Sequence, residues 1–460
     1  MIISIDPTTG LERERFPYQT PQEINTALSA AHTAQAAWRL RPIADRVNLL
    51  RSMAKVLRAG RSAYAELITL EMGKPILEAE GEIDKCAWNC EFYAEAAPGF
   101  LAPELVGTNA SESAVVFDPL GVVLAIMPWN YPFWQFFRFA APAFAAGNAA
   151  VLKHANNVPQ CALAVEEVVR KAASEAGAPA SLCRTLLIAA TDVAGVIDDD
   201  RIAAVTLTGS TEVGRIVAAR AGRALKKQVL ELGGSDPFLV LADADIAAAA
   251  VTAVKARFTN NGQSCINAKR FIVEESVADE FVEAFAAGVG KLKVGNPLDR
   301  TTEVGAMARA NLRFELHQQV EATLAAGATL KVGGRYLERP GFFYAPTILD
   351  HVTPEMTAFR EETFGPVAAI VRVKDADEAI ARANQTAFGL GAALWTQDLE
   401  RARTLAARID AGAVFINGLV ASDPRLPFGG IKQSGYGREL GHYGLKEFVN
   451  IKSLWIGPAR

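Results

Sequence analysis

Apolar residues in the first hundred positions recur at intervals of three and four, the period of helices that bury one face. Four segments share this pattern, and each ends at or just before a Pro or Gly: residues 24–40, 44–60, 62–75 and 80–97. We therefore predict a group of packed helices at the start of the chain. None of these segments shows an obvious arrangement of catalytic residues.

The pattern changes to alternating strands and helices after residue 119. Helix-like segments separate short apolar runs at residues 121–130, 148–155, 181–189, 202–210 and 226–234. This order is typical of an open parallel sheet, in which ligands bind beyond the carboxyl ends of the strands. We therefore expect a ligand site at that edge of the first sheet.

A second alternation of strands and helices begins near residue 233 and predicts another α/β domain. Its predicted strands lie in residues 238–245, 269–275, 327–334, 367–373, 392–396 and 413–417, with helices over 246–258 and 277–291. Upstream, residues 102–118 contain short alternating pieces after a Pro- and Gly-rich entry, which favours an outlying hairpin.

The composition is that of an ordinary globular protein with two or three domains. Half of the 460 residues are apolar, 21% are charged and the formal net charge is −4, so nothing favours a nucleic-acid partner. The N-terminus lacks the basic region of a secretory signal, and the longest apolar region, residues 139–152, is too short to span a bilayer. We therefore expect a cytosolic protein without a membrane partner.

Cysteine and histidine are too few and too scattered to predict a disulfide framework or a metal site. The chain has five residues of each type. Cys86 and Cys90 would share a helix face, but two ligands make no site, and core packing is the favoured interpretation. We expect no bound metal.

Cys265 lies in the segment FTNNGQSCINAKR, residues 258–270. The small polar residues before it are unsuited to a core strand or helix and predict a loop that presents the thiol. Taken alone, however, a free cysteine is more often a small buried hydrophobic residue than a nucleophile.

Three further segments contain candidate chemistry, each with a plainer alternative. Glu231 in ELGGSDP stands at a strand end as a candidate general base or a solvated carboxylate. Asn130 in PWNYP stands between two prolines as a candidate oxyanion donor or a turn residue. Ser210 in GSTEVG opens a helix, where it would help to bind a pyrophosphate or serve only as the N-cap.

The order and separation of seven segments resemble those of the aldehyde dehydrogenase superfamily over nearly the whole chain. These segments are PWN, LKHA, TGSTEVG, ELGGSDP, GQSC, EETFGPV and PFGGIKQSG. MPWNYPFWQ, LKHANN, ELGGSDPF and VTPEMTAFREETFGPVAA are most similar to bacterial succinate-semialdehyde dehydrogenases of the Sad type.

The resemblance implies an α/β fold of three parts. Residues 1–101 and 119–232 would form a Rossmann-type NAD(P)-binding domain, and residues 233–430 a catalytic domain. Residues 102–118 and 443–460 would form a β oligomerisation arm, which in this family pairs with a neighbouring subunit. A homodimer or homotetramer is therefore expected.

The resemblance also implies a role for each candidate catalytic residue. Cys265 would attack the aldehyde carbonyl, and the Asn130 side chain with the Cys265 backbone N–H would hold the oxyanion. After hydride transfer to the nicotinamide, Glu231 would activate the water that hydrolyses the thioester to a carboxylic acid.

The implied cofactor is NAD or NADP. Its expected contacts, by the same resemblance, are Trp129, Asn130, Lys153, His154, Ala155, Asn156, Gly209, Ser210, Leu232, Glu362 and Phe364. The chain departs from the usual Lys-Pro-Ala/Ser string, and Asn156 stands where many NAD-specific members carry Glu. Without that charge nothing repels a 2′-phosphate, so both cofactors stay open.

Arg138 and Ser422 match the residues with which relatives bind the distal carboxylate of succinate semialdehyde. A second arginine, expected six residues before the cysteine, is Thr259 in this chain. Arg425 or Arg257 would be its substitute. Arg138 as a purely structural ion pair is the plainer alternative.

Three functions stay open at this point. The first is NAD(P)-dependent oxidation of succinate semialdehyde, or of another short aliphatic aldehyde, to the free acid. The second is a CoA-acylating semialdehyde dehydrogenase, against which the retained Glu231 argues. The third is a non-catalytic protein that keeps only the fold, against which Cys265, Glu231 and Asn130 argue together.

Overall fold

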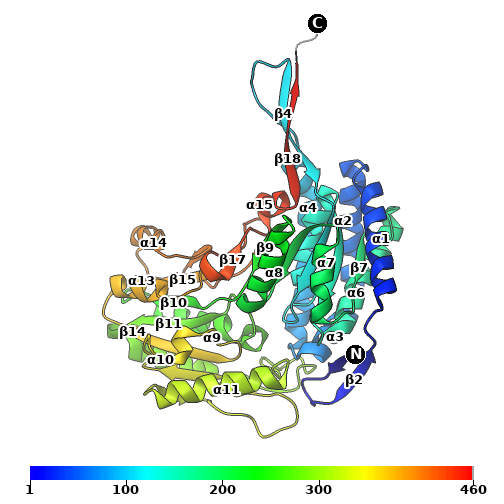
Figure 1. The fold of residues 1–460 in the computed structure, drawn as a ribbon. Helices are drawn as coiled ribbons and strands as arrows, with labels where there is room; N and C mark the ends of the chain where they lie inside the picture. The colour runs from blue at the N-terminus through cyan, green and yellow to red at the C-terminus, as the bar shows by residue number, and fades with distance from the viewer. Residues whose placement is uncertain (458–460) are drawn as a thin grey trace.

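The N-terminal helices lie together on one side of the molecule in the computed structural model, which describes residues 1–457 (Figure 1). They are α1 (Pro21–Trp38), α2 (Ile43–Ala59), α3 (Arg61–Met72) and α4 (Ile76–Phe100). Thr20 and Glu23 form a reciprocal capping box at the start of α1. The predicted group of helices is confirmed. A hairpin of β1 (Ile2–Ile5) and β2 (Glu12–Phe16) precedes it and was not predicted.

The first sheet has the strand order β17-β9-β8-β5-β6-β7. Its parallel strands are β5 (Val122–Met127), β6 (Ala149–His154), β7 (Cys183–Thr185), β8 (Ile202–Thr208) and β9 (Lys227–Glu231), and β17 (Gly435–Tyr436) joins antiparallel. The connecting helices are α5 (Trp134–Ala146), α6 (Pro159–Ala176), α7 (Val193–Asp198) and α8 (Thr211–Arg223). The predicted parallel sheet is confirmed, and its near-continuous apolar strands are buried on both faces.

The second sheet has the order β12-β13-β14-β11-β10-β15-β16. Its strands are β10 (Asp236–Val240), β11 (Ala268–Glu274), β12 (Thr329–Val332), β13 (Thr347–Asp350), β14 (Val367–Val373), β15 (Gly391–Trp395) and β16 (Ala413–Ile416). Its helices are α9 (Ile246–Phe258), α10 (Glu275–Val289), α11 (Ala310–Ala325), α12 (Thr357–Arg360), α13 (Ala376–Asn384) and α14 (Leu399–Ala406). The second α/β alternation is confirmed, although β13 and the helices α11, α12, α13 and α14 were not predicted.

A narrow β arm projects from the molecule (Figure 1). β4 (Glu112–Pro119) lies between the short β3 (Glu104–Leu105) and β18 (Val449–Ile456), and all three pair antiparallel. α15 (Gly441–Lys446) leads into β18. The arm segment predicted at 443–460 ends with three residues that lie outside the described ones.

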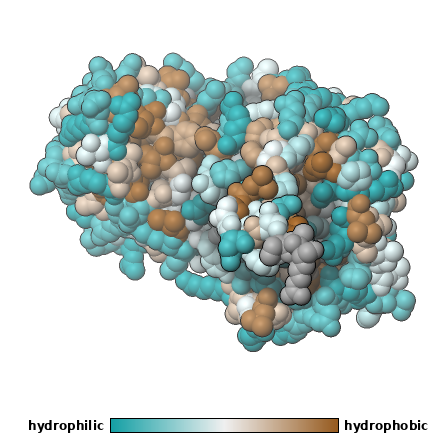
Figure 2. All heavy atoms as spheres, turned by 90° about the horizontal axis from the view of Figure 1, so that it is seen from above, coloured by the Kyte–Doolittle hydropathy of each residue, from teal (hydrophilic) through white to brown (hydrophobic). Residues whose placement is uncertain are grey.

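Apolar side chains are exposed along β18. Ile451, Leu454, Trp455 and Ile456 are 41–61% exposed. Figure 2 looks at the molecule from above and shows groups of hydrophobic residues between hydrophilic ones. No described helix is long and apolar enough to cross a bilayer.

Candidate active site

The first sheet changes direction at β5, which makes the carboxyl ends of β5 and β8 its topological switch point. From β5 the chain proceeds outward to β6 and β7, then returns to the other side of β5 with β8 and β9. Trp129 and Asn130 follow β5, and Gly209 and Ser210 follow β8. Ligands in open α/β sheets bind at such a crevice.

A cavity of about 230 Å³ lies at this switch point. Its wall includes Trp129, Asn130, Gly209, Ser210, Leu232, Gly233, Cys265, Arg309, Glu362 and Phe364. Ser210 caps α8 by accepting the Val213 N–H, so the helix N-terminus faces the cavity region with its positive end. The predicted N-cap is therefore present at a place that also suits a pyrophosphate.

The loop before Cys265 has a backbone that few residue types tolerate. Asn260, Asn261 and Gly262 have φ values of 57°, 56° and 71°. Asparagine and glycine adopt this left-handed region most readily. A Cβ on Gly262 would lie 2.4 Å from the Gly365 carbonyl, so this glycine is required for close packing as well.

The side chains of the same loop fasten it to its surroundings. The Asn261 amide donates to the Gly73 and Ala306 carbonyl oxygens at 2.8 and 2.9 Å. The Ala308 N–H donates to the Gln263 side chain at 3.0 Å. A loop of this kind, with buried amide side chains, holds Cys265 in a fixed position.

Asn130, which follows β5, is hydrogen-bonded to this loop. Its side-chain nitrogen donates to the Gln263 carbonyl at 3.0 Å, and its backbone carbonyl accepts from Asn260 at 2.9 Å. Among residues 1–457 the Asn130 amide nitrogen donates to the Gln263 carbonyl alone, so its second N–H has no partner there, and the residue lines the cavity beside Cys265. The amide is thus a fixed donor available to an oxyanion.

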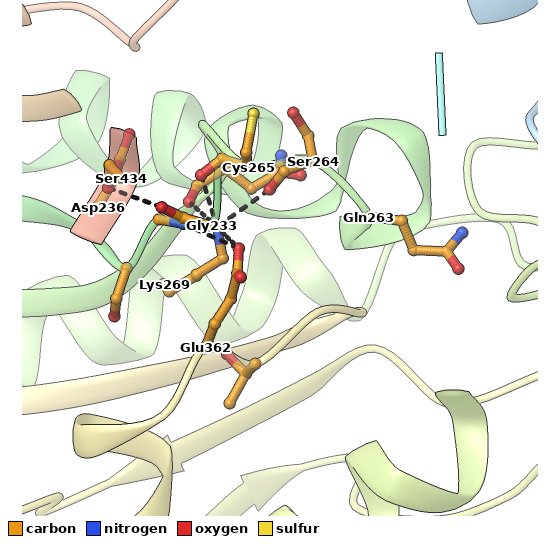
Figure 3. Close-up of polar contacts among 12 residues, drawn as sticks. Gly233, Asp236, Gln263, Ser264, Cys265, Lys269, Glu362 and Ser434 are labelled. Carbon is orange, nitrogen blue, oxygen red and sulfur yellow. Dashed lines mark hydrogen bonds and ion pairs between the residues drawn. The ribbon is translucent and has the colours of Figure 1, made fainter. Parts of the chain in front are cut away.

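Lys269 lies beneath the Cys265 loop, as Figure 3 shows. Its ammonium donates to the carbonyl oxygens of Ser264, Cys265 and Asn267 at 2.8–3.2 Å and is 3.4 Å from the Glu362 carboxylate. The Cys265 sulfur points away from Lys269 (Figure 3). Lys269 therefore fixes the loop backbone rather than the thiol.

Burial opposes ionisation of the nucleophile. It raises the pKa of Cys265 to about 12, although Arg138 and Lys269 lower that pKa in part. The thiol is therefore protonated at neutral pH in the ligand-free protein, and attack on a carbonyl requires removal of this proton.

Glu231 ends β9 in a buried position, only 2% exposed. Burial, followed by the neighbouring charge of Glu439, raises the pKa of Glu231 well above its usual range. Neither carboxylate oxygen of Glu231 has a hydrogen-bond partner among the described residues, and Glu231 lines neither cavity beside Cys265. The interpretation as a solvated surface carboxylate is therefore wrong.

The predicted cofactor contacts fall into two groups. Trp129, Asn130, Gly209, Ser210, Leu232, Glu362 and Phe364 share the cavity at the switch point. Lys153 and His154 end β6, the adjacent strand, Ala155 and Asn156 follow it, and none of the four lines that cavity.

Two side chains at the end of β6 form hydrogen bonds within the protein. The Lys153 ammonium donates to Asn156 Oδ1 at 2.8 Å, and burial lowers the pKa of Lys153 to about 8. The His154 imidazole contacts the Pro132 carbonyl at 2.9 Å, and burial lowers the pKa of His154 to about 4. The neutral imidazole therefore supports the strand and is not directed at the cavity.

A second cavity, of about 280 Å³, lies on the other side of Cys265. Its wall includes Glu78, Glu82, Lys85, Tyr131, Trp134, Gln135, Arg138, Thr259, Ser264, Cys265, Ile266, Ser422 and Phe428. The structure thus brings the predicted substrate residues Arg138 and Ser422 together with Cys265. It also places Thr259 in the same wall.

The two suggested replacements for the missing arginine do not line this cavity. The Arg257 guanidinium is buried and donates to the backbone carbonyls of Thr363 and Gly365. Arg425 is exposed and forms two hydrogen bonds with Asp423. The suggestion that either one completes the substrate site is wrong.

Several site residues were not found from the sequence. Arg309 and Gln135 line the first cavity, Lys85 lines the second, and Lys269 supports the Cys265 loop. For Lys269 a signal existed, since a charged residue at the start of a predicted sheet strand with the apolar centre Phe271-Ile272-Val273 requires a partner when it is buried. Lys85 had none, because its neighbours form an ordinary helical pattern. No group of three or more His, Cys, Asp or Glu residues that could hold a metal ion occurs within positions 1–457.

Comparisons with known proteins agree with this arrangement. Residues 1–454 match the model of the aldehyde dehydrogenase family. The chain is 50% identical to a probable NADP(+) succinate-semialdehyde dehydrogenase of Synechocystis sp., over 99% of both chains. It is 49% identical to the succinate semialdehyde dehydrogenase [NAD(P)+] Sad of Escherichia coli, over 98% of this chain and 97% of the relative.

Solved structures show the same fold. A succinic semialdehyde dehydrogenase from Streptococcus pyogenes, in complex with NADP+, superposes with a TM-score of 0.96 at 38% identity and covers 100% of both chains. The structure of Gox0499, described for its cofactor and substrate selection, also has a TM-score of 0.96, at 42% identity over 99% of this chain and 100% of that chain. The chain therefore belongs to the aldehyde dehydrogenase family, as its sequence motifs indicated.

Proposed function

We propose that this enzyme oxidises succinate semialdehyde to succinate with NAD+ or NADP+. The observation that carries the proposal is the position of Cys265 in the wall shared by two cavities. One has the residues and strand ends of a dinucleotide site, and the other contains cationic side chains. An aldehyde bound to this thiol would face both cavities. The names of the relatives support succinate semialdehyde as the substrate.

The residues of the first cavity fit a dinucleotide. Gly209 leaves room for a ligand at the end of β8. A Cβ built on it would have one described neighbour within 4 Å, a Leu207 methyl carbon at 3.7 Å. Ser210 and the α8 N-terminus would hold the pyrophosphate, Lys153 the adenosine ribose and Glu362 the nicotinamide ribose, with Phe364 beside the ring. When bound, the nicotinamide supplies the hydride acceptor.

In the proposed reaction, the Cys265 thiol gives its proton to water and the sulfur bonds to the aldehyde carbon, while the C=O double bond opens and leaves its electron pair on the oxygen. The Asn130 amide and the Cys265 backbone N–H hold the resulting oxyanion. Loss of hydride from that carbon gives a thioester. Water then adds to the thioester carbon, Glu231 accepts its proton, and the C–S bond breaks to release the acid and the thiolate.

The proposed base role of Glu231 requires its side chain to turn toward Cys265 and to lose its proton first. Gly429 packs closely against Glu231, since a Cβ at that position would lie 2.7 Å from a Glu231 oxygen. A hydrolytic ending, and not transfer to CoA, is supported by the presence of Glu231 as a buried carboxylate without a hydrogen-bond partner among the described residues. Release of free succinate in the absence of CoA tests this choice.

A direct assay tests the proposed function. The wild type is expected to reduce NADP+ or NAD+ with succinate semialdehyde, measured as absorbance at the reduced-nicotinamide band. Cys265→Ala is expected to lower kcat by about a thousandfold or more. Retention of activity in that variant, or absence of activity in the wild type, would refute the proposal.

We also infer that NADP+ is accepted as a cofactor as well as NAD+, without a ranking of the two. Asn156 carries no charge to repel a 2′-phosphate. The Lys153 ammonium donates to Asn156 Oδ1 at 2.8 Å, so a positive charge lies beside this position. The ratio of kcat/KM for the two cofactors measures the preference between them. Strict inability to use NADP+ would overturn the argument from Asn156.

The arm supports a proposal about assembly. We propose that β18 pairs with a second copy of the chain in a dimer or a dimer of dimers, because its outer edge is unpaired within positions 1–457. We also propose a cytosolic location, which cell fractionation tests. The division into domains at residues 101, 119, 232 and 430 stays a proposal about how the chain is organised.

A further inference from the structure

Arg138, the arginine expected to bind the substrate carboxylate, is already paired inside the protein. It forms an ion pair with Glu439, and both side chains are 2% exposed. Its guanidinium also lies 4.6 Å from the centre of the Phe428 ring and donates to Thr208 at 3.4 Å. Its positive charge is therefore balanced before any substrate enters.

Lys85 is the other cation in the wall of this cavity, and it has no such partner. Within residues 1–457 no carboxylate lies at ion-pair distance from its ammonium. The nearby Asp423 is held by Arg425, and Glu82 is held by Lys74 and by the Phe133 and Trp134 N–H groups. Lys85 thus contributes an uncompensated positive charge.

The position of the Lys85 ammonium is fixed by two contacts. It donates to the Ser422 hydroxyl at 2.7 Å and lies 4.4 Å from the centre of the Trp134 ring. Because the Ser422 oxygen accepts this bond, its own hydrogen stays free to donate. Lys85 and Ser422 together therefore offer two donors to one anion.

Thr259 and Glu78, which line the same cavity, offer no comparable cation. Thr259 occupies the place of the second arginine, and its hydroxyl donates to the Lys255 carbonyl at 2.8 Å. Glu78 accepts the Asn260 N–H at 2.6 Å, and burial raises its pKa to about 7. An anionic end of a substrate is therefore drawn toward Lys85 and away from Glu78.

We propose that Lys85, positioned by Ser422, binds the distal carboxylate of the substrate and supplies the cation that Thr259 lacks. This inference rests on the proposed function and specifies its substrate class as short aldehydes with a carboxylate at the far end. In this assignment Arg138 is mainly a partner of Glu439. α4, which the sequence presents as an ordinary packed helix, thereby contributes a specificity residue.

Two aldehydes of equal length separate carboxylate binding from catalysis. We compare succinate semialdehyde with butanal, which has four carbons and no carboxylate, in wild type, Lys85→Met and Lys85→Arg. Lys85→Met is expected to lower kcat/KM for succinate semialdehyde by about 30-fold or more, mainly through KM, and to lower that for butanal far less. Lys85→Arg is expected to restore most of the loss.

Lys55→Met is the matched control, because Lys55 is an exposed lysine whose ammonium lies 3.2 Å from Glu175 on the surface. It is expected to leave both substrates unaffected. Equal values of kcat/KM in wild type and Lys85→Met, or an equal loss for both aldehydes, would overturn the inference. Failure of the wild type itself to oxidise succinate semialdehyde would instead refute the proposed function.

The pH dependence supplies a second readout. Burial and then the Arg138 charge lower the pKa of Lys85 to about 8, against the opposing effects of Cys86, Asp423 and Glu82. As pH rises through this range, wild-type Lys85 loses its charge while an arginine keeps it. The kcat/KM of Lys85→Arg divided by that of the wild type is therefore expected to rise above pH 8. Glu78, whose pKa is about 7, is present in both proteins, so its titration affects them alike. A ratio independent of pH would contradict the assignment.

Discussion

At the scale of single residues, the Cys265 thiol combines fixed placement with a high barrier to ionisation. Hydrogen bonds from Lys269 to the loop carbonyls fix its backbone, while burial keeps the sulfur protonated. A protected thiol of this kind resists oxidation and alkylation until ligands arrive. The same burial that lowers reactivity in the free enzyme excludes water from the site during hydride transfer.

The raised pKa of Cys265 predicts how the ligand-free enzyme reacts with iodoacetamide. Because the pKa of Cys265 is about 12, the thiolate fraction increases about tenfold with each pH unit between 7 and 9. Inactivation without cofactor is expected to follow the same slope. The rate is measured as loss of activity with time, and a plateau below pH 8 would show that the thiol is ionised at neutral pH.

Arg138 and Glu439 form a buried ion pair on which the stability of the fold depends. Removing the guanidinium leaves a buried carboxylate next to Glu231 without a counter-charge. We expect Arg138→Met to destabilise the fold by about 3–5 kcal/mol, seen as a lower melting temperature. Adding Glu439→Gln removes the orphaned charge and is expected to recover part of the loss. If the double variant melts lower than the single one, the charge argument fails.

At the scale of elements, the loop between α9 and β11 determines the geometry of the nucleophile. Its turn depends on the left-handed residues Asn260, Asn261 and Gly262. Gly262→Ala is expected to cost about 2 kcal/mol or more, because alanine is strained there and its methyl group meets the Gly365 carbonyl. Activity is expected to fall with stability.

The control for this change is Gly107→Ala, where an added Cβ meets no atom within 4 Å. Melting temperature and kcat are measured for both variants. An unchanged melting temperature in Gly262→Ala would mean that the loop adjusts without cost and does not fix Cys265.

Local patterns were enough to predict most strands and helices, whereas the roles of the site residues came from the resemblance to a known family. Asn130 and Ser210 follow β5 and β8, so the order of the strands alone places them at the switch point, but Cys265 precedes β11 of the second sheet and reaches that point only through the packing of the two sheets. Contacts between side chains far apart in the sequence could not be predicted from local patterns. Lys85 and Ser422 are 337 positions apart, and no local spacing signals their contact. The replacements suggested for Thr259 failed for the same reason.

At the scale of the whole molecule, the two sheets meet at Cys265. The first sheet contributes Asn130 and Ser210 from its strand ends, and the second contributes the Cys265 loop before β11. β17 then returns from the far end of the chain to the first sheet, beside Glu231. The site is therefore assembled from both halves, so domain motion would change both cavities together.

The arm predicts the oligomeric state. β18 pairs with β4 over eight residues, from Val449 with Pro119 to Ile456 with Glu112, and its other edge is open within the described chain. Because exposed apolar edge strands promote pairing, the wild type is expected to sediment as a dimer or tetramer of 49.2 kDa subunits.

Charges on the arm should prevent this assembly. The double variant Leu454→Lys, Trp455→Lys places two positive charges on residues that are 41% and 55% exposed in the single chain, and it is expected to shift the protein to monomer. Phe314→Lys, at a residue of α11 that is as exposed as Trp455, lies on a helix at the opposite end of the molecule from the arm (Figure 1) and is expected to leave assembly intact. Light scattering after size exclusion measures the mass of each. A monomeric wild type, or an oligomeric double variant, would show that β18 does not form the interface.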